Sequence, residues 1–234
     1  YYSFDVNVLL ATKVIRTADD MAAVRISLDQ LTAYTPIEGY YVLGNNIDFA
    51  NAQIHTDMSN VIKNLNDQYW NKNQGFRGTF DGLNHKITNV KVGQGGLFGY
   101  VGQNAIIKNV NFENVSYIGA YCGSLLGFSV MNATVQDINV KVSSYTNGRD
   151  YPYTQGFLSA RFTAGCKLNN VKIDASECTV YSLFGNQVGD KVVTTYSGVE
   201  IKVKAYTMFA NQGKDVNSND KKIAPDGVDV ITVA

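Results

Sequence analysis

One short pattern recurs along the chain and constrains its fold more than any other feature. In each copy an apolar residue is followed two positions later by Asn, Asp or Gly, then at once by Val or Ile, and two positions further on by another apolar residue. From Val90 onward the Val or Ile recurs after 20 to 33 residues, a period typical of repeat proteins. The five full copies centre on Asn89, Asn109, Asp137, Asn170 and Gly198.

The residue types predict the local structure of each copy. After the central residue the apolar positions alternate with a period of two, as in a strand with one buried face. Before it the spacing is three, which breaks the alternation unless the backbone bends. Asn, Asp and Gly adopt a positive φ at low cost, so they suit such a bend. Each copy therefore predicts a strand, a bend and a second strand.

A second pattern, two apolar residues beside small residues, lies between the copies of the first. It occurs at residues 96–99, 124–127, 157–160, 182–185 and 207–210. Its small residues allow layers of chain to approach closely or to turn a corner. Because the two patterns alternate, we predict an all-β fold, a single-stranded parallel β-helix with coils about 4.8 Å apart. A β-sandwich also has alternating strands, but it does not explain a bend residue in every repeat.

The stretch at residues 76–90, followed by Gly-Leu-Phe-Gly and then by Ala105 to Val110, resembles the GLUG-motif repeats of bacterial (Bacteroides-type) surface and secreted proteins. Residues 39–49 resemble the coil that commonly precedes those repeats. The resemblance implies a right-handed, pectin-lyase-like β-helix, exposure at the cell surface, and adhesion or contact with surface glycans without a reaction. The chain departs from the family at Leu83 and Lys86, where the family tends to have Asn and a small residue.

The N-terminal region predicts a cap for the first coil. Thr17 and Asp20 resemble a capping box, in which the two residues bond to each other's backbone N–H. A short amphipathic helix over residues 17–35 follows from the apolar face that Met21, Val24, Leu28 and Leu31 would form. Such a helix would hide the open edge of the first coil.

The domain organisation follows from these elements. Residues 17–234 form one β-helix domain, with coils over residues 39–234. Residues 1–16 are either a first strand or a linker from an upstream region, and both readings stay open. Because the chain starts with Tyr1 rather than Met, we expect it to be a segment of a longer multidomain protein.

Charge and hydropathy exclude some classes of partner. The chain has 20 acidic and 20 basic residues, mixed throughout. Nucleic acids and anionic membrane surfaces require clustered Lys and Arg, so neither is an expected partner. No run of 18 apolar residues occurs, so we expect no membrane insertion.

Two insertions between the coils, residues 51–74 and 143–155, are the predicted binding surface. Loops on a rigid scaffold are where binding surfaces are usually built. Aromatic rings stack on sugars, and Arg and Asp bond to hydroxyl groups. The alternative is that these rings pack on the outside of the coils. The candidate ligand-binding residues are Tyr69, Trp70, Tyr145, Arg149, Asp150, Tyr151 and Tyr153.

The sequence predicts no catalytic residues. Carbohydrate-active β-helices use external carboxylates, with calcium and an Arg base in lyases. Asp137, Asp174 and Glu200 lie near predicted strands, but neither they nor the nearest arginines, Arg77, Arg149 and Arg161, form a cluster in sequence.

We expect no metal site and no cofactor. His55 and His85 are too few and too far apart for a zinc site or a triad. Cys122, Cys166 and Cys178 lack a CxxC spacing, so buried ladder positions are the simplest interpretation, with a Cys166–Cys178 bridge left open.

Together these features predict an extracellular or cell-surface (outer-membrane-exposed) adhesin-like module that contacts glycans or host surface proteins. A passive spacer within a larger surface protein, and a polysaccharide lyase or hydrolase, are the alternatives.

Overall fold

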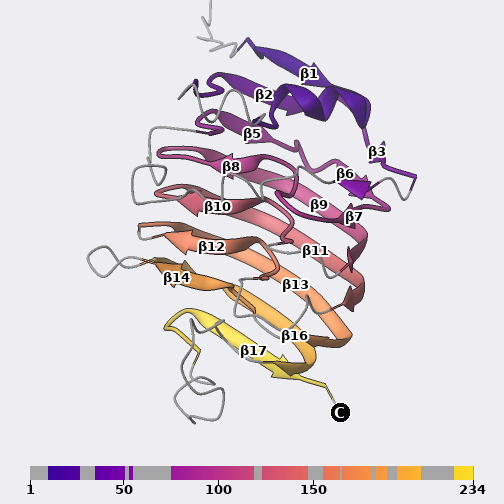
Figure 1. Ribbon diagram of the computed structural model, residues 1–234, viewed down its shortest axis with the longest axis vertical. Coiled ribbons are helices and arrows are strands. Elements are labelled where there is room, and N and C mark those ends of the chain that lie inside the picture. Colours follow the sequence, from indigo (N-terminus) through magenta and orange to yellow (C-terminus); the bar gives the residue numbers. More distant parts are fainter. Residues whose placement is uncertain are drawn as a thin grey trace, which may run out of the picture.

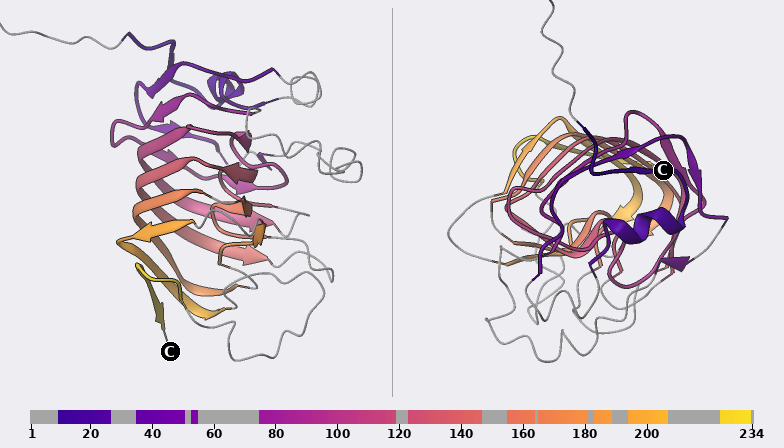
Figure 2. Two further views of the ribbon diagram at one scale, coloured as in Figure 1. Left: turned by 90° about the vertical axis from the view of Figure 1, so that its left-hand side faces the viewer. Right: turned by 90° about the horizontal axis from the view of Figure 1, so that it is seen from above.

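The computed structural model of the chain is a parallel β-solenoid of about five turns, with the coils stacked along one axis (Figure 1). Seen along that axis, the coils wrap around a common centre (Figure 2). The structure describes residues 10–26, 35–50, 53–54, 75–118, 123–146, 155–163, 165–180, 183–188, 194–206 and 224–233.

The larger sheet has 13 strands, and all of its pairings are parallel. Its main stack is β1 (Lys13–Ile15), β2 (Tyr40–Leu43), β5 (Thr79–Asp81), β9 (Ile106–Ile118), β11 (Thr134–Thr146), β13 (Lys167–Val180), β16 (Val199–Tyr206) and β17 (Val228–Thr232). Beside it lie β3 (Ile47–Asp48), β4 (Gln53–Ile54), β6 (Lys86–Thr88), β7 (Lys91–Val92) and β15 (Thr195–Ser197). The parallel pairing between successive coils confirms the predicted β-helix and rules out the β-sandwich.

A second sheet of four strands closes the other side of the coils. Its order is β14 (Asn186–Val188), β12 (Ser159–Thr163), β10 (Gly127–Met131) and β8 (Gly99–Val101). Four copies of the second sequence pattern lie at or just before the start of these strands, and their apolar pairs are buried. The fifth copy, residues 207–210, lies outside the described residues. Its glycines permit the close approach of the layers: a Cβ on Gly185 would lie 2.1 Å from the carbonyl oxygen of Ala160.

All five predicted bend residues have a positive φ, between 49° and 62°. Asn109, Asp137 and Asn170 lie in register on three successive coils, because their neighbours on both sides are paired. The Asn170 amide donates to the Asp137 carboxylate at 2.7 Å. The prediction that these bends stack above one another is confirmed.

Asn89 is the exception to the predicted alignment of repeats. Ile87 pairs with Phe112 and not with Ile107, so Asn89 lies beside Asn114 at a second bend. The Asn114 amide donates to the Asn89 side-chain oxygen at 2.5 Å. The cause is an extra turn over residues 82–85, closed by a hydrogen bond of 2.8 Å from the His85 N–H to the Gly82 carbonyl. Because of this turn, the strand before Asn89 aligns with the chain after the Asn109 bend on the next coil, and not with the chain before it.

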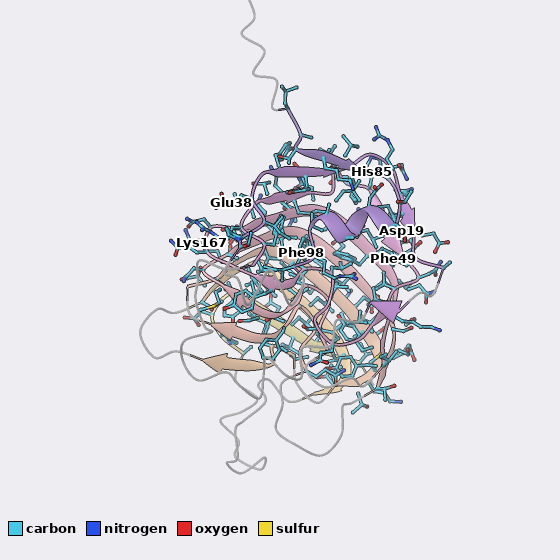
Figure 3. All side chains as sticks on the ribbon, turned by 45° about the horizontal axis from the view of Figure 1, so that its top comes forward. Asp19, Glu38, Phe49, His85, Phe98 and Lys167 are labelled. Carbon is cyan, nitrogen blue, oxygen red and sulfur yellow. The ribbon has the colours of Figure 1, made fainter. Side chains whose placement is uncertain are left out.

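The core is a set of apolar ladders along the axis. One inward ladder contains Tyr41, Phe80, Ile107, Val135 and Leu168, all less than 8% exposed. Phe98 packs inside the coils (Figure 3), with its ring centroid 4.9 Å from that of Phe76 and 5.3 Å from that of Phe80. Identical environments on neighbouring coils explain why like residues recur in the sequence.

The predicted capping helix is wrong for the described residues. In its place is a five-residue 3-10 helix, η1 (Asp19–Ala23), and the described part of the chain contains no α-helix. Met21 and Val24 are fully buried as predicted, but a spacing of three residues also suits a 3-10 turn. Leu28 and Leu31 lie outside the described residues.

The predicted capping box is present. The Asp20 N–H donates to the Thr17 hydroxyl at 3.2 Å, and the Thr17 N–H donates to the Asp20 carboxylate at 3.1 Å. The segment that follows covers the coil edge at β8, where the Ile26 N–H donates to the Phe98 carbonyl at 3.0 Å. Among the described residues, no helix is long and apolar enough to cross a membrane.

Candidate functional site

The two predicted binding insertions start from stacked strand ends. Residues 55–74 follow β4, and residues 147–154 follow β11. Ile54 pairs with Val92, Val92 with Tyr117, and Tyr117 with Tyr145, so these four residues form one column, which we call the loop edge. Three steps of about 4.8 Å place the two departure points about 14 Å apart.

Of the seven candidate binding residues, the structure describes Tyr145. Its ring packs against Tyr117, with centroids 4.9 Å apart, and against Phe157, with centroids 5.5 Å apart. The hydroxyl of Tyr145 is buried without a hydrogen-bond partner in the described structure. Burial, with the nearby Cys178 thiol adding to it, raises the pKa of Tyr145 above its usual range. Tyr145 thus packs at the base of the second insertion. The other six candidates, Tyr69, Trp70, Arg149, Asp150, Tyr151 and Tyr153, lie outside the described residues.

The ends of the second insertion are held together. The Gln155 amide donates to the Thr146 carbonyl at 3.1 Å, across residues 147–154. The Tyr117 hydroxyl donates to the Phe157 carbonyl at 2.7 Å, which links β9 of the neighbouring coil to the chain after the insertion. The insertion is therefore mounted on a packed aromatic base.

A second feature, the charged groove, lies on the outer face of β9, β11, β13 and β16. It is a hollow of about 270 Å³, lined by Asn111, Phe112, Glu113, Asn139, Val140, Lys141, Lys172, Ile173, Asp174, Glu200 and Lys202. Opposite charges alternate between neighbouring strands, since Lys172 pairs with Glu200, and Asp174 pairs with both Lys141 and Lys202. Lys202 also contacts Glu200 at 3.5 Å.

The groove brings together only some of the carboxylates considered for catalysis. Asp174 and Glu200 meet there, whereas Asp137 lies at a bend and accepts from Asn170. Arg77 contacts Glu38 at 3.4 Å, away from the groove; Arg149 and the Arg161 side chain are not described. No group of three metal-ligating side chains occurs in the described part of the chain.

Asp81, which lies in residues 76–90, has a structural role and holds neighbouring coils together. It is 4% exposed and accepts from the Leu83 N–H at 3.0 Å, the Asn109 amide at 3.0 Å and the Tyr40 hydroxyl at 3.1 Å. The Lys108 ammonium lies 3.2 Å from it. Burial acts to raise the pKa of Asp81, but these four donors outweigh it and lower the pKa. The carboxylate is therefore held ionised between coils.

The remaining polar candidates are also structural. Cys166 and Cys178 are buried and form no disulfide, so the bridge left open by the sequence is absent and the ladder interpretation holds for these two. Cys122 and His55 lie outside the described residues. His85 closes the extra turn through its backbone N–H.

Sequence reasoning missed a second hollow as well as the charged groove. It measures about 510 Å³ and lies where the chain enters β9, β11 and β13. The sequence does mark this corner, because Asn104, Asn132 and Gly165 recur after 28 and 33 residues, the same spacing as the bends. In the structure all three residues have a positive φ.

Comparison with known proteins adds no assignment. No protein-family model, curated protein or solved structure matches the chain. The site must therefore be interpreted from its own geometry.

Proposed function

We propose that this chain is a non-catalytic binding module of a cell-surface or secreted protein, and that it contacts glycans through the two insertions at the loop edge. The observation that carries the proposal is the shared column of Ile54, Val92, Tyr117 and Tyr145. Two aromatic-rich segments that are far apart in the sequence thereby leave one edge of the molecule about 14 Å apart.

The chemistry of the insertions fits sugars. Tyr69 and Trp70 in the first and Tyr151 and Tyr153 in the second supply flat apolar faces, on which the C–H faces of pyranose rings stack. Arg149 and Asp150 supply a donor and an acceptor for hydroxyl groups. A rigid scaffold reduces the entropy lost when such a surface binds.

Location at the cell surface rests on the resemblance to GLUG-motif repeats. The parallel solenoid agrees with the coil architecture that this resemblance implies, and a right-handed winding belongs to the same proposal. Adhesion to glycans or host surface proteins, within a longer multidomain chain, is the role that this family context supports.

A glycan array tests the proposal. The wild-type chain is compared with Trp70→Ala, Tyr151→Ala and a variant in which a Gly-Ser segment of equal length replaces residues 147–154, with Thr146 and Gln155 retained. We expect binding of at least one glycan class, weakened about tenfold or more by each change. The matched control replaces residues 189–193, which follow β14 in the sequence, whereas the loop edge belongs to β4, β7, β9 and β11. Equal loss in the control, or no bound glycan, contradicts the proposal.

A passive spacer is the second candidate, because the unbroken apolar ladders make the solenoid a continuous stack. A spacer predicts that the array stays empty while the chain still separates two fused domains. Fluorescence energy transfer between dyes on the two ends measures that separation.

A further inference from the structure

Two rows of side chains run along one side of the solenoid, across the stacked strands β6, β9, β11, β13, β16 and β17 (Figure 1). In strand order the first row is Lys86, Asn111, Asn139, Lys172, Glu200 and Asp229. The second row, two residues further along each strand, is Thr88, Glu113, Lys141, Asp174, Lys202 and Ile231. We call the two rows together the charged face, and the charged groove lies within it.

The pairing of the strands fixes the order of the second row. Lys141 lies between Val140, which pairs with Phe112, and Val142, which pairs with Val115. Glu113 is therefore its neighbour on β9. On the other side Lys141 pairs with Asp174, which in turn pairs with Lys202. Along the solenoid the charges of this row alternate as negative, positive, negative and positive.

Both rows point outward. The residues between them on β6, β9, β11, β13 and β16 are apolar and at most 2% exposed, namely Ile87, Phe112, Val140, Ile173 and Ile201. Since side chains alternate along a strand, their neighbours face away from the core. Six residues of the two rows are exposed and the others are partly exposed; the exposed ones are Lys86, Asn139, Lys141, Lys172, Asp229 and Ile231.

Much of the charge on this face is not used within the described structure. Lys86 contacts Glu113 at 2.8 Å, and Lys202 contacts Glu200 at 3.5 Å. The other four charged residues form no ion pair with any described residue: Lys141, Lys172, Asp174 and Asp229. These four remain available to a partner.

The alternating row is complementary to its own reverse. A two-fold axis that is parallel to the strands and passes between β11 and β13 turns a second copy end over end and sets its charged face against the first. Glu113 then faces Lys202 of the second copy, and Lys141 faces Asp174 of the second copy. Sheets that pack face to face lie about 10 Å apart, a gap that these long side chains span from both sides.

The first row fits the same operation. Lys86 faces Asp229 of the second copy, which is again a pair of opposite charges. Asn139 faces Lys172 of the second copy; its amide donates to the Asn111 side-chain oxygen at 2.8 Å, so its own oxygen can accept from the ammonium group. Asn111 faces Glu200 of the second copy and has a second amide N–H to donate, since the first goes to the Asn84 carbonyl at 3.2 Å.

The charges also specify the register. If the second copy is displaced by one strand in one direction, Lys141 faces Lys202 and Asp174 faces its own copy. Displacement by one strand in the other direction brings Glu113 opposite Asp174. Like charges across an interface suppress the wrong arrangement, so the order of charges selects one alignment of the two copies.

We propose that the charged face binds a second copy of this chain, with the two solenoids antiparallel and related by a two-fold axis. Such an interface is isologous, because the same patch is used on both copies. Exposed ion pairs contribute little individually and are screened by salt, so the dimer is weak and salt-sensitive. The inference goes beyond the proposed function and does not depend on it, because it uses none of the insertion residues.

Sedimentation velocity over a range of protein concentrations tests the proposal. At about 20 mM NaCl we expect a monomer–dimer equilibrium, and at about 1 M NaCl, where the Debye length falls to about 3 Å, we expect monomer. Lys141→Glu and Asp174→Lys each place two like-charge contacts in the interface. Each variant alone should raise the dissociation constant at least about tenfold.

Mixing the two variants provides the decisive arm. In a mixed pair Glu at position 141 of one chain faces Lys at position 174 of the other, while the native Asp174 and Lys141 face each other at the second contact. The mixture should therefore form a heterodimer although each variant alone is monomeric. Lys167→Glu is the matched control: it makes the same charge change on an exposed residue of β13 outside the charged face, and it should leave the dimer intact.

The outcomes separate the arrangements. Loss of the dimer in both variants, recovery on mixing and retention in the control support the antiparallel dimer. With parallel axes Asp174 would face Lys172 of the second copy and Lys141 would face Asn139, so loss in Asp174→Lys alone overturns the antiparallel arrangement. A wild-type chain that is monomeric at low salt, or a dimer that is lost equally in Lys167→Glu, overturns the proposal. Circular dichroism verifies that every variant is folded.

Discussion

The turn over residues 82–85 provides a sharp test of the backbone geometry. Leu83 has a φ of 48° and Asn84 a φ of 63°, which are the two central positions of a type I′ turn. Leu83 is also 49% exposed. A leucine is poorly suited to this conformation, because its Cβ lies too close to the following carbonyl oxygen. We predict that Leu83→Asn is more stable than Leu83→Ala.

The magnitude follows from what the two substitutions share. Both remove the half-buried leucine side chain, so the loss of its apolar contacts is similar in the two variants. Only Asn relieves the strain of a positive φ, which costs roughly 1–2 kcal/mol for an ordinary residue. The Asn variant should therefore exceed the Ala variant by about 1 kcal/mol in free energy of unfolding. For a chain of this size that corresponds to about 2–4 °C in Tm.

Urea denaturation followed by circular dichroism measures the difference, with equal m values as the condition for comparing midpoints. Leu83→Gly is the control. Glycine relieves the same strain but loses more conformational entropy on folding, so it should fall between Ala and Asn. Equal midpoints for Ala and Asn would refute the reasoning, since strain at Leu83 would then carry no cost.

Four further predictions concern other positions. Asp81→Asn should destabilise the fold by about 2 kcal/mol, measured by urea denaturation, because it removes the charge that Lys108 pairs with and one acceptor of the cluster. The pKa of Asp20 is lowered to about 2 by hydrogen bonds from the Arg16 backbone N–H, the Lys13 ammonium and Thr17. The ionised carboxylate therefore stabilises the fold fully above about pH 4, and this effect is lost as the pH falls towards 2. The difference in free energy of unfolding between wild type and Asp20→Asn, measured by urea denaturation at each pH, should vanish over that window. Burial raises the pKa of Cys166 to about 11, so a thiol reagent at pH 8 should modify Cys166 only on unfolding; modification of the native protein, detected by mass spectrometry, contradicts this. Gly185→Ala should prevent folding, because the added Cβ would meet the Ala160 carbonyl oxygen. Gly198→Ala places its Cβ no closer than 3.7 Å to another atom, so it should cost only about 1–2 kcal/mol, for the positive φ at this position. Similar melting temperatures for the two variants would contradict the close packing at Gly185.

The bends were predictable from sequence because their cause is local. A residue that must adopt a positive φ is selected by its own backbone, so Asn109, Asp137, Asn170 and Gly198 reveal themselves without knowledge of their neighbours. The assignment of Asn89 to its corner was not predictable in the same way. Its local pattern matches the others, and only the extra turn at residues 82–85 moves it to the second bend.

The capping segment shows the same limit. The burial of Met21 and Val24 is compatible with either an α-helix or a 3-10 helix, so it does not distinguish them. After the 3-10 turn, the chain is held at the coil edge by the long-range hydrogen bond from the Ile26 N–H to the Phe98 carbonyl. The charged groove and the hollow where the chain enters β9, β11 and β13 also escaped prediction, because each arises from the register of strands about 30 residues apart in sequence. The spacing of Asn104, Asn132 and Gly165 was a usable signal, but it pointed to a corner and not to a hollow.

The candidate site combines both kinds of information. The aromatic composition of the insertions is visible in the sequence, whereas their common edge follows only from the pairing of Tyr117 with Tyr145 and of Val92 with Ile54. Under the proposed function, a ligand that contacts both insertions gains from engaging them at once, because binding one raises the effective concentration at the other. A chain of sugar units should therefore bind the loop edge more tightly than a single unit of the same sugar, as measured by isothermal titration calorimetry. Equal affinities for the two sugars would contradict a binding surface that both insertions share.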